Sequence, residues 1–216
     1  MPNPIDTLIQ AKRSWAEWKQ RHCSPLLSPP LLSFRIPSPP TPNRLIGWTS
    51  PEDNIIKLNF DGSLSPAGTA AGYILRDSSG RLIKAGTRFM YDALILVTEA
   101  TTLRDGLKAA LDAGMMYLHI EGDNRMVIQA IKGKIHIPWR IQMLVHDSRT
   151  MLSSFTSPTI QHIFHEGNMA TDWIVKLGVL FKTGLTFSHS PSPELSCIIH
   201  ADYLGKKPLR EVLSKV

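Results

Sequence analysis

Hydrophobic and polar positions alternate along the middle of the chain in a way that predicts strands. Residues 55–61 alternate, with Ile56, Leu58 and Phe60 on one face and Lys57, Asn59 and Asp61 on the other, and the segment ends in an acid, Asp61. This period of two predicts a half-buried strand. Two further apolar runs, at residues 69–76 and 81–90, are separated by Asp77–Gly80, which is a hairpin signal. Residues 55–90 are therefore predicted to form three antiparallel strands.

The next apolar positions recur with a helical period. Leu103, Leu107 and Leu111 are spaced four residues apart between Glu99 and Ala113, which predicts a helix with Glu99 in its first turn and Gly114 as its C-cap. The segments after this helix follow the order strand, helix, helix, strand, helix, at residues 116–122, 123–131, from Pro138 to 152, 159–164 and 169–177, with Gly178 ending the last helix. The expected fold is α/β, with a mixed sheet of five strands.

Composition describes an ordinary globular chain and excludes several classes. The 216 residues are 43% hydrophobic and 19% charged, with a net charge of +6, which rules out collagen, a coiled coil and full disorder. There is no run of about 20 apolar residues and no secretory signal pattern. Cys23 and Cys197 stand too far apart to suggest a disulfide framework or a cysteine-based zinc site. We expect an intracellular, soluble protein without a membrane partner, its compartment left open among nucleus, cytoplasm and organelle.

Proline and charge divide the chain into three parts. Ten of the 16 prolines lie within the first 51 residues, and the basic excess lies in the two flanks, while the middle is neutral. We therefore predict a proline-rich basic extension or linker at residues 1–50, one domain at 51–180 and a C-terminal tail at 181–216.

Four carboxylates stand at the ends of predicted elements: Asp61, Glu99, Asp123 and Asp172. If the first and fourth strands are parallel neighbours, Asp61 and Asp123 lie side by side at one edge of the sheet. Clustered carboxylates repel one another unless they are protonated or bridged by cations, and oxygen ligands suit Mg²⁺ or Mn²⁺. The alternative is structural, because acids also serve as helix caps and turn residues.

Several short sequence motifs follow one another along the chain. They are Trp48-x-x-Pro51, Lys57-Leu58-Asn59-Phe60-Asp61-Gly62-Ser63, Ala71-Gly72-Tyr73-Ile74-Leu75-Arg76-Asp77, Glu99-Ala100, Glu121-Gly122-Asp123-Asn124 and His165-Glu166-Gly167-Asn168-x-x-Thr171-Asp172. In these motifs and their order the chain resembles the ribonuclease H family, in particular the plant-type domains of retrotransposon reverse-transcriptase-like proteins. The resemblance implies a ribonuclease H-like fold, in which three antiparallel strands are followed by two parallel ones and helices flank the sheet.

The resemblance also implies an activity and a metal cofactor. Asp61, Glu99, Asp123 and Asp172 correspond to the family's four metal-binding acids. The implied reaction is endonucleolytic hydrolysis of the RNA strand of an RNA/DNA hybrid, with two Mg²⁺ ions that Mn²⁺ can replace. The implied partner is the hybrid, bound by a monomer.

Other residues in or beside these motifs are candidates for nucleic-acid contacts or for catalysis. Gly62 and Ser63 would let the backbone and a hydroxyl approach the RNA, while Asn124 and Arg125 would contact the minor groove and a phosphate. For Asn124 the competing interpretation is a helix N-cap. His165 falls near a loop histidine that assists product release in some bacterial relatives, and an exposed histidine at a strand end is its alternative.

Two features leave the function open. The apolar residues Ile95–Val97 before Glu99 favour a second hypothesis, a domesticated retroelement domain that binds nucleic acid or protein with little or no catalysis. Trp15 and Trp18 lie at helical spacing near the N-terminus and are a candidate docking segment for a protein partner; a remnant of an upstream reverse-transcriptase polyprotein is the other interpretation.

Overall fold

The computed structural model describes residues 47–189 and 191–204 of the chain. The strands are β1 (Ile56–Ser65), β2 (Gly68–Arg76), β3 (Leu82–Met90), β4 (Leu118–Gly122), β5 (Thr159–His162) and β6 (Leu185–Ser188). The α-helices are α2 (Ile95–Asp112), α3 (Arg125–Ile131), α4 (Gln142–Leu152), α5 (Met169–Phe181) and α6 (Pro193–Tyr203), with short 3-10 turns η1 (Trp139–Ile141) and η2 (His165–Gly167). No helix within these two ranges is long and apolar enough to cross a bilayer. The predicted docking tryptophans, Trp15 and Trp18, lie outside them.

The strands form one mixed sheet in the order β5-β4-β1-β2-β3-β6. β1, β2 and β3 are antiparallel neighbours, and β4 runs parallel to both β1 and β5. The predicted α/β class and arrangement are confirmed, but the predicted count of five strands is wrong. The sixth strand, β6, has only four residues and pairs antiparallel with β3. So short a strand carries little periodic signal, and its pairing with β3 defines it.

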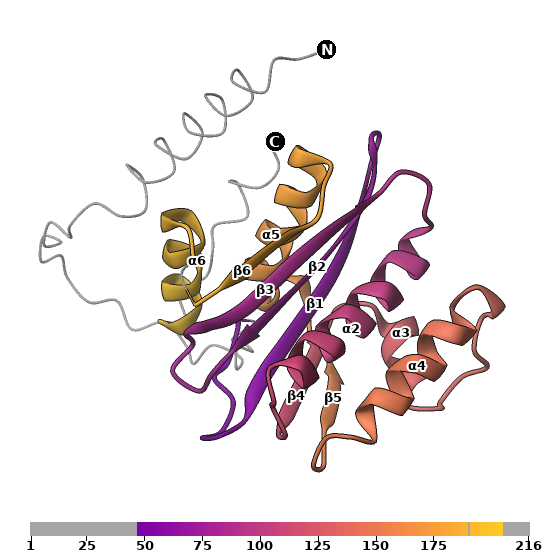
Figure 1. The fold of residues 1–216 in the computed structure, drawn as a ribbon, viewed down its shortest axis with the longest axis horizontal. Coiled ribbons are helices and arrows are strands. Elements are labelled where there is room, and N and C mark those ends of the chain that lie inside the picture. Colours follow the sequence, from indigo (N-terminus) through magenta and orange to yellow (C-terminus); the bar gives the residue numbers. More distant parts are fainter. Residues whose placement is uncertain (1–46, 190, 205–216) are drawn as a thin grey trace, which may run out of the picture. The chain divides into compact units, whose positions relative to one another are not determined.

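Helices cover both faces of this sheet. Figure 1 shows α2, α3 and α4 on one side, with α5 and α6 on the other. The larger core lies under α2 and includes Leu58, Phe60 and Leu103, all fully buried, and the smaller core lies under α5 and α6 around Ile74, Ile174 and Leu195. The division into domains at residues 50 and 180 stays a prediction; beyond residue 180, β6 extends this sheet and α6 packs into its smaller core.

β1 is buried on both faces, although its sequence alternates. Leu58 and Phe60 face the larger core, whereas Lys57, Asn59 and Asp61 face the other side and are also buried. The ammonium of Lys57 pairs with Glu121 of β4 at 2.8 Å, and the amide of Asn59 donates to the same carboxylate at 3.1 Å. Lys57 and Asn59 thus have a hydrogen-bond partner on β4 in place of water, as buried polar groups require.

A second buried ion pair fastens α6 to the sheet. The guanidinium of Arg76 in β2 is fully buried and lies 2.8 Å from Oδ2 of Asp202 in α6. The same guanidinium stacks 4.1 Å from the centre of the Trp48 ring and donates to the Asn59 side chain at 3.1 Å. Because both charges of the pair are withdrawn from water, α6 is bound to the sheet by electrostatics as well as by apolar packing.

The ends of two helices differ from the sequence prediction. α2 begins at Ile95, so Glu99 lies one turn inside the helix and not in its first turn. Leu94 gives no side-chain cap, and Leu96 and Val97 pack against the larger core, so that packing starts this helix. α5 continues past Gly178 and ends at Phe181, because the glycine serves close packing: a Cβ there would collide with the hydroxyl of Thr87 on β3.

Candidate active site

The parallel pairing of β1 with β4 places two acids together. Phe60 and Gly122 are register partners at the end of this pairing, and Asp61 and Asp123 follow them directly. Asp61 is buried, and Asp123 is partly exposed at the start of the loop before α3. The side-by-side position that the sequence suggested for these two carboxylates is therefore present in the structure.

Glu99 reaches the same place from α2. It is 5% exposed, and α2 approaches β1 so closely there that a Cβ on Gly62 would lie 3.0 Å from Glu99 Cγ. The hydroxyl of Thr102, one turn further along α2, lies 3.2 Å from the backbone carbonyl oxygen of Asp61 and 2.9 Å from that of Thr98, and its proton is shared between these two acceptors. Helix and strand are thus held together on either side of the two carboxylates.

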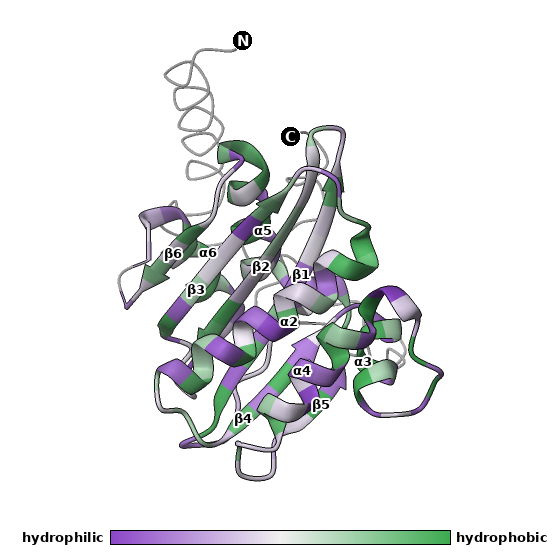
Figure 2. Cartoon of the chain, turned by 45° about the vertical axis from the view of Figure 1, so that its right-hand side comes forward, coloured by the Kyte–Doolittle hydropathy of each residue, from purple (hydrophilic) through white to green (hydrophobic). Residues whose placement is uncertain are grey.

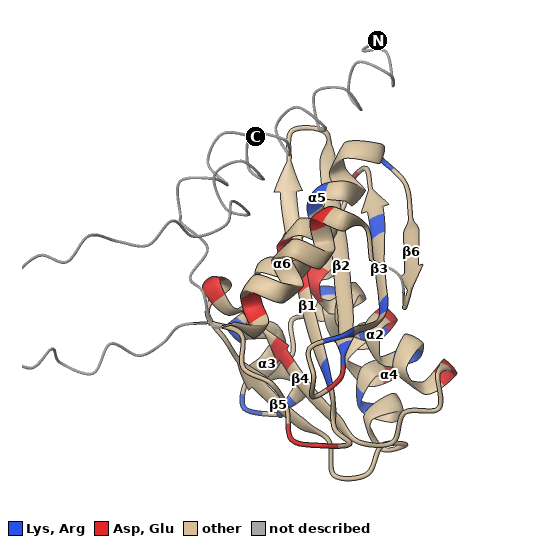
Figure 3. Cartoon of the chain, turned by 90° about the vertical axis from the view of Figure 1, so that its left-hand side faces the viewer, with Lys and Arg blue, Asp and Glu red and all other residues tan. Residues whose placement is uncertain are grey.

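Asp172 arrives from the opposite layer, in the first turn of α5. The loop before it is anchored by Asn168, which is fully buried and whose amide donates to the backbone carbonyl of Phe60 at 2.9 Å. Lys176, one turn later in α5, places its ammonium 3.2 Å from Asp172 Oδ2. Figure 3 shows this side of the sheet, with acidic positions on α5 and on the strands behind it.

The four acids converge as two overlapping groups. One ligand atom from each of Asp61, Glu99 and Asp123 lies within 4.8 Å of the others, and the same holds for Asp61, His165 and Asp172. Asp61 belongs to both groups. The structure therefore brings together all four predicted carboxylates and His165, around one shared aspartate.

Burial and mutual repulsion perturb two of these acids strongly. Loss of solvation, reinforced by the charges of Asp123 and Asp172, raises the pKa of Asp61 to about 8. Loss of solvation with the charges of Asp61 and Asp123 raises the pKa of Glu99 to about 9, which the Asn124 side chain partly offsets. Glu99 Oε2 is buried and has no hydrogen-bond partner. An orphaned carboxylate oxygen among repelling acids is the environment that a divalent cation would stabilise, so these residues fit the metal that the fold implies.

His165 lies at the edge of this cluster, in η2. Its side chain is 52% exposed, and its Nδ1 lies 3.7 Å from Asp123 Oδ2. The contact with Asp123, together with the charges of Asp172 and Asp61, raises the pKa of His165. His162, three residues earlier, instead places Nε2 3.0 Å from the backbone carbonyl of Asp123. Only one of the two neighbouring histidines therefore has a ring nitrogen grouped with the carboxylates.

The four residues predicted to contact nucleic acid follow Asp61 or Asp123 in the sequence, and they differ in exposure and hydrogen bonding. Asn124 is the N-cap of α3, because its Oδ1 accepts from the backbone N–H groups of Met126 and Val127 at 3.0 and 3.2 Å. Arg125 is exposed, and Gly62 and Ser63 are partly exposed in β1. Asn124 therefore caps α3, as the alternative interpretation predicted. The contacts of all four residues with nucleic acid stay predictions.

Three residues of this region were not assigned a role from the sequence: Thr102, Asn168 and Lys176. The Thr102 hydroxyl and the Asn168 amide contact backbone carbonyls of β1, which is distant in sequence. The Lys176 ammonium contacts the carboxylate of Asp172, one helical turn earlier. The signal for Lys176 was present, since it follows Asp172 by four residues in a helix. Thr102 and Asn168 act through backbone carbonyls of β1, a contact that only the folded arrangement reveals.

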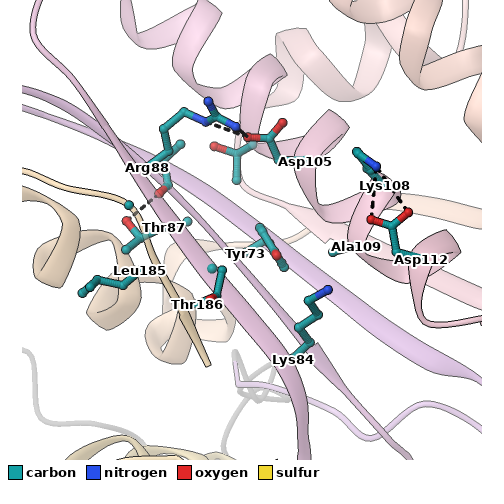
Figure 4. A pocket seen from close by; sticks show the side chains of 15 residues that line it. Tyr73, Lys84, Thr87, Arg88, Asp105, Lys108, Ala109, Asp112, Leu185 and Thr186 are labelled. Atoms are coloured by element: carbon teal, nitrogen blue, oxygen red, sulfur yellow. Dashed lines mark hydrogen bonds and ion pairs between the residues drawn. The ribbon is translucent and has the colours of Figure 1, made fainter. Parts of the chain in front are cut away.

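A separate pocket of about 540 Å³ lies over β2, β3 and β6 beside α2, and none of the four clustered acids lines it. In Figure 4 its walls carry two internal ion pairs, Arg88 with Asp105 and Lys108 with Asp112, at 2.8 and 3.1 Å. These pairs neutralise most of the charge that the walls present.

The sheet order, the helices on both faces and the two acids that follow the last register pair of β1 and β4 define a ribonuclease H-like domain. The model of the family described as "Reverse transcriptase-like" matches residues 59–178, and the chain belongs to this family. A protein of Arabidopsis thaliana named "Putative ribonuclease H protein" is 23% identical over 175 residues, which are 80% of this chain. The chain spans 28% of the length of that relative.

Solved structures share the fold at low sequence identity. RNase H1 from Halobacterium salinarum is 21% identical and has a TM-score of 0.55, covering 58% of this chain and 97% of its own. The N-terminal RNase H domain of a Mycobacterium tuberculosis protein is 14% identical, also with a TM-score of 0.55, covering 59% and 96%. At these identities the likeness demonstrates the common fold.

Proposed function

We propose that this protein is a Mg²⁺-dependent endonuclease that hydrolyses the RNA strand of RNA/DNA hybrids and leaves a 3′-hydroxyl and a 5′-phosphate. The observation that carries the proposal is the convergence of Asp61, Glu99, Asp123 and Asp172 in two groups that share Asp61. Family membership and the name of the Arabidopsis relative support the same reaction class.

Two divalent ions, when bound, would activate the attacking water and stabilise the leaving oxygen. The residues that would hold them are Asp61 with Glu99 and Asp123 on one side, and Asp61 with Asp172 on the other. The contribution of the chain is rigidity, because three of the carboxylates lie on a central strand and two helices and the fourth, Asp123, directly follows β4. Thr102 and Asn168 fix those elements through the backbone carbonyls of Asp61 and Phe60. Preorganised ligands of this kind avoid reorganisation during the reaction.

Substrate contacts would come from the partly exposed rim. Ser63 lies two residues after Asp61 in β1 and so points to the same face of the sheet. Its hydroxyl is suited to a 2′-hydroxyl, the group that distinguishes RNA from DNA. Arg125 is exposed beside Asp123 and suited to a phosphate. With few basic residues near the acids, we expect weak intrinsic binding of the hybrid.

Cleavage of an end-labelled RNA/DNA hybrid tests this function. Wild-type protein with Mg²⁺ at low salt is compared with Asp123→Asn and with Asp112→Asn, a matched control on the exposed end of α2. We expect hybrid-specific cutting by wild type and by Asp112→Asn, lost in Asp123→Asn and unaffected by single-stranded or duplex RNA competitors. A folded wild-type sample that cuts no better than Asp123→Asn, with Mg²⁺ or Mn²⁺, would refute the proposal in favour of a binding module without catalysis.

A further inference from the structure

The second group of possible metal ligands contains a nitrogen. Asp61, Glu99 and Asp123 offer only carboxylate oxygens, whereas Asp61, His165 and Asp172 combine two carboxylates with an imidazole, all within 4.8 Å. Asp61 and Asp172 are 5% and 8% exposed, so both carboxylates of this second group are buried. The imidazole is the one solvent-facing member, at the open side of the cluster.

The backbone around His165 is fixed on both sides, which holds the ring near the acids. In η2, the carbonyl of Phe164 accepts from Gly167 N–H at 2.9 Å, and the carbonyl of His165 accepts from Asn168 N–H at 2.8 Å. Asn168 is in turn bound to β1 through the carbonyl of Phe60. The ring of His165 is therefore carried by a turn that is attached directly to the strand bearing Asp61.

The neighbouring histidine does not compete for this place. His162 directs Nε2 to the backbone carbonyl of Asp123 and packs edge-on against the ring of Phe164, with centroids 5.6 Å apart. Among the described residues, the His165 side chain has one polar partner, Asp123, at 3.7 Å, which is longer than a hydrogen bond. Its ring nitrogens are thus available to a ligand.

We propose that His165 is a nitrogen ligand of a divalent ion held with Asp61 and Asp172, and that it makes this position prefer Mn²⁺ to Mg²⁺. Imidazole binds first-row transition metals well, whereas Mg²⁺ selects oxygen donors. The position formed by Asp61, Glu99 and Asp123 has only oxygen donors and carries no such preference. This inference rests on the proposed function, because it names the preferred metal at one half of the same site.

Mn²⁺ binding without nucleic acid tests the inference on the full chain. Pulsed electron paramagnetic resonance detects ¹⁴N coupled to bound Mn²⁺, and titration calorimetry measures the affinities of Mn²⁺ and Mg²⁺. The variants are His165→Gln, which keeps an oxygen donor but removes the imidazole, and His162→Gln as the matched control. Circular dichroism and a thermal melt establish that each variant is folded.

We expect ¹⁴N modulation in wild type and in His162→Gln, and its loss in His165→Gln. The affinity of one Mn²⁺ position should fall about tenfold or more in His165→Gln, with Mg²⁺ affinity changed much less because the glutamine oxygen substitutes. Wild type that binds no Mn²⁺, or binds it without nitrogen coupling, overturns the inference. So does a nitrogen signal that survives His165→Gln or that disappears in His162→Gln.

The outcomes separate this inference from the nuclease proposal. Nitrogen-coupled Mn²⁺ in a protein that cuts no hybrid refutes the nuclease and leaves His165 as a ligand. Hybrid cleavage by a protein whose bound Mn²⁺ has no nitrogen neighbour refutes the ligand and leaves the nuclease.

Discussion

Gly62 and Glu99 are in van der Waals contact across the junction of β1 and α2, where a Cβ on residue 62 would come within 3.0 Å of Glu99 Cγ and within 3.2 Å of Thr98 Cγ2. The absence of a side chain on Gly62 therefore sets how closely the buried carboxylate of Glu99 approaches that of Asp61. The hydropathy colours of Figure 2 show that α2 begins with apolar residues. The packing of this first turn positions the part of the helix that carries Glu99.

Replacing Gly62 by alanine should impair catalysis more than folding. The added methyl group would push Glu99 by a few tenths of an ångström, while the strand gains from losing a flexible glycine, so we expect a stability change within about 1 kcal/mol. The cleavage rate should fall about tenfold, because catalytic groups tolerate little displacement. Gly47→Ala is the control, since no atom lies within 4 Å of its added Cβ. Equal rates for both variants would contradict the role of this contact.

Replacing glutamate by glutamine should change the stability of the protein in opposite directions at two buried positions, Glu99 and Glu121. The pKa of Glu99 is raised to about 9 by burial and by Asp61 and Asp123. The pKa of Glu121 is lowered to about 2, because hydrogen bonding by His119, the Lys57 ammonium and Gln161 outweighs its burial. In chelator at pH 7.5, Glu99→Gln should therefore stabilise the protein by about 1 kcal/mol or more. Glu121→Gln should destabilise it by about 3–5 kcal/mol, because the buried ammonium of Lys57 loses its counter-charge and keeps only the hydrogen bonds to Thr49.

Urea unfolding monitored by circular dichroism measures both changes. Glu99→Gln should also lose the stabilisation that wild type gains from added Mg²⁺, whereas Glu121→Gln should keep it. A destabilised Glu99→Gln would show that Oε2 of Glu99 has a partner in the metal-free protein, whereas the structure leaves this oxygen without one.

The metal-free protein should become less stable as the pH rises from about 5 to about 8. Asp61 and Glu99 have folded-state pKa values of about 8 and about 9, above their values in an unfolded chain. Across this window the folded state binds more protons than the unfolded state, so the free energy of unfolding decreases with pH. Mg²⁺ should reverse the trend, because it binds the ionised carboxylates and its affinity rises as their protons leave. Thermal melts in chelator and in Mg²⁺ at several pH values measure this; a metal-free stability that rises over the window would contradict it.

The arrangement of Asp61 and Asp123 was accessible from the sequence for a local reason. The alternation of residues 55–61 located the strand but not its end, because β1 continues to Ser65 and Asp61 lies inside it. The acid after the fourth strand could be placed beside Asp61 once the two strands were taken as parallel neighbours. Asp172 in the first turn of α5 followed from the same kind of local pattern. The presence of a strand and the start of a helix are encoded by neighbouring residues, so the acids associated with them can be predicted from local sequence patterns.

Other features depend on contacts between distant segments. Alternation in β1 predicts one polar face open to water, yet Lys57 and Asn59 are buried because Glu121 of β4 accepts from both. Gly178 has the signal of a helix end, but its lack of a side chain serves the approach to Thr87. β6 is defined by its pairing with β3, and Asn168 by its bond to the carbonyl of Phe60. None of these partners lies within the local windows from which periodicity is read.

The ion pair between Arg76 and Asp202 should make α6 necessary for folding of the domain, although α6 lies beyond the segment matched by the family model. The pair is 0% and 4% exposed, so Asp202→Asn would leave the guanidinium buried without its counter-charge. We expect a loss of about 3–5 kcal/mol, the usual result of removing one partner of a buried pair. Asp112→Asn breaks an exposed pair with Lys108 on α2, whose side chains are 52% and 69% exposed, and should cost less than about 1 kcal/mol. Urea unfolding of the full chain compares the two; similar small losses would mean that Trp48 and Asn59 alone suffice to hold Arg76.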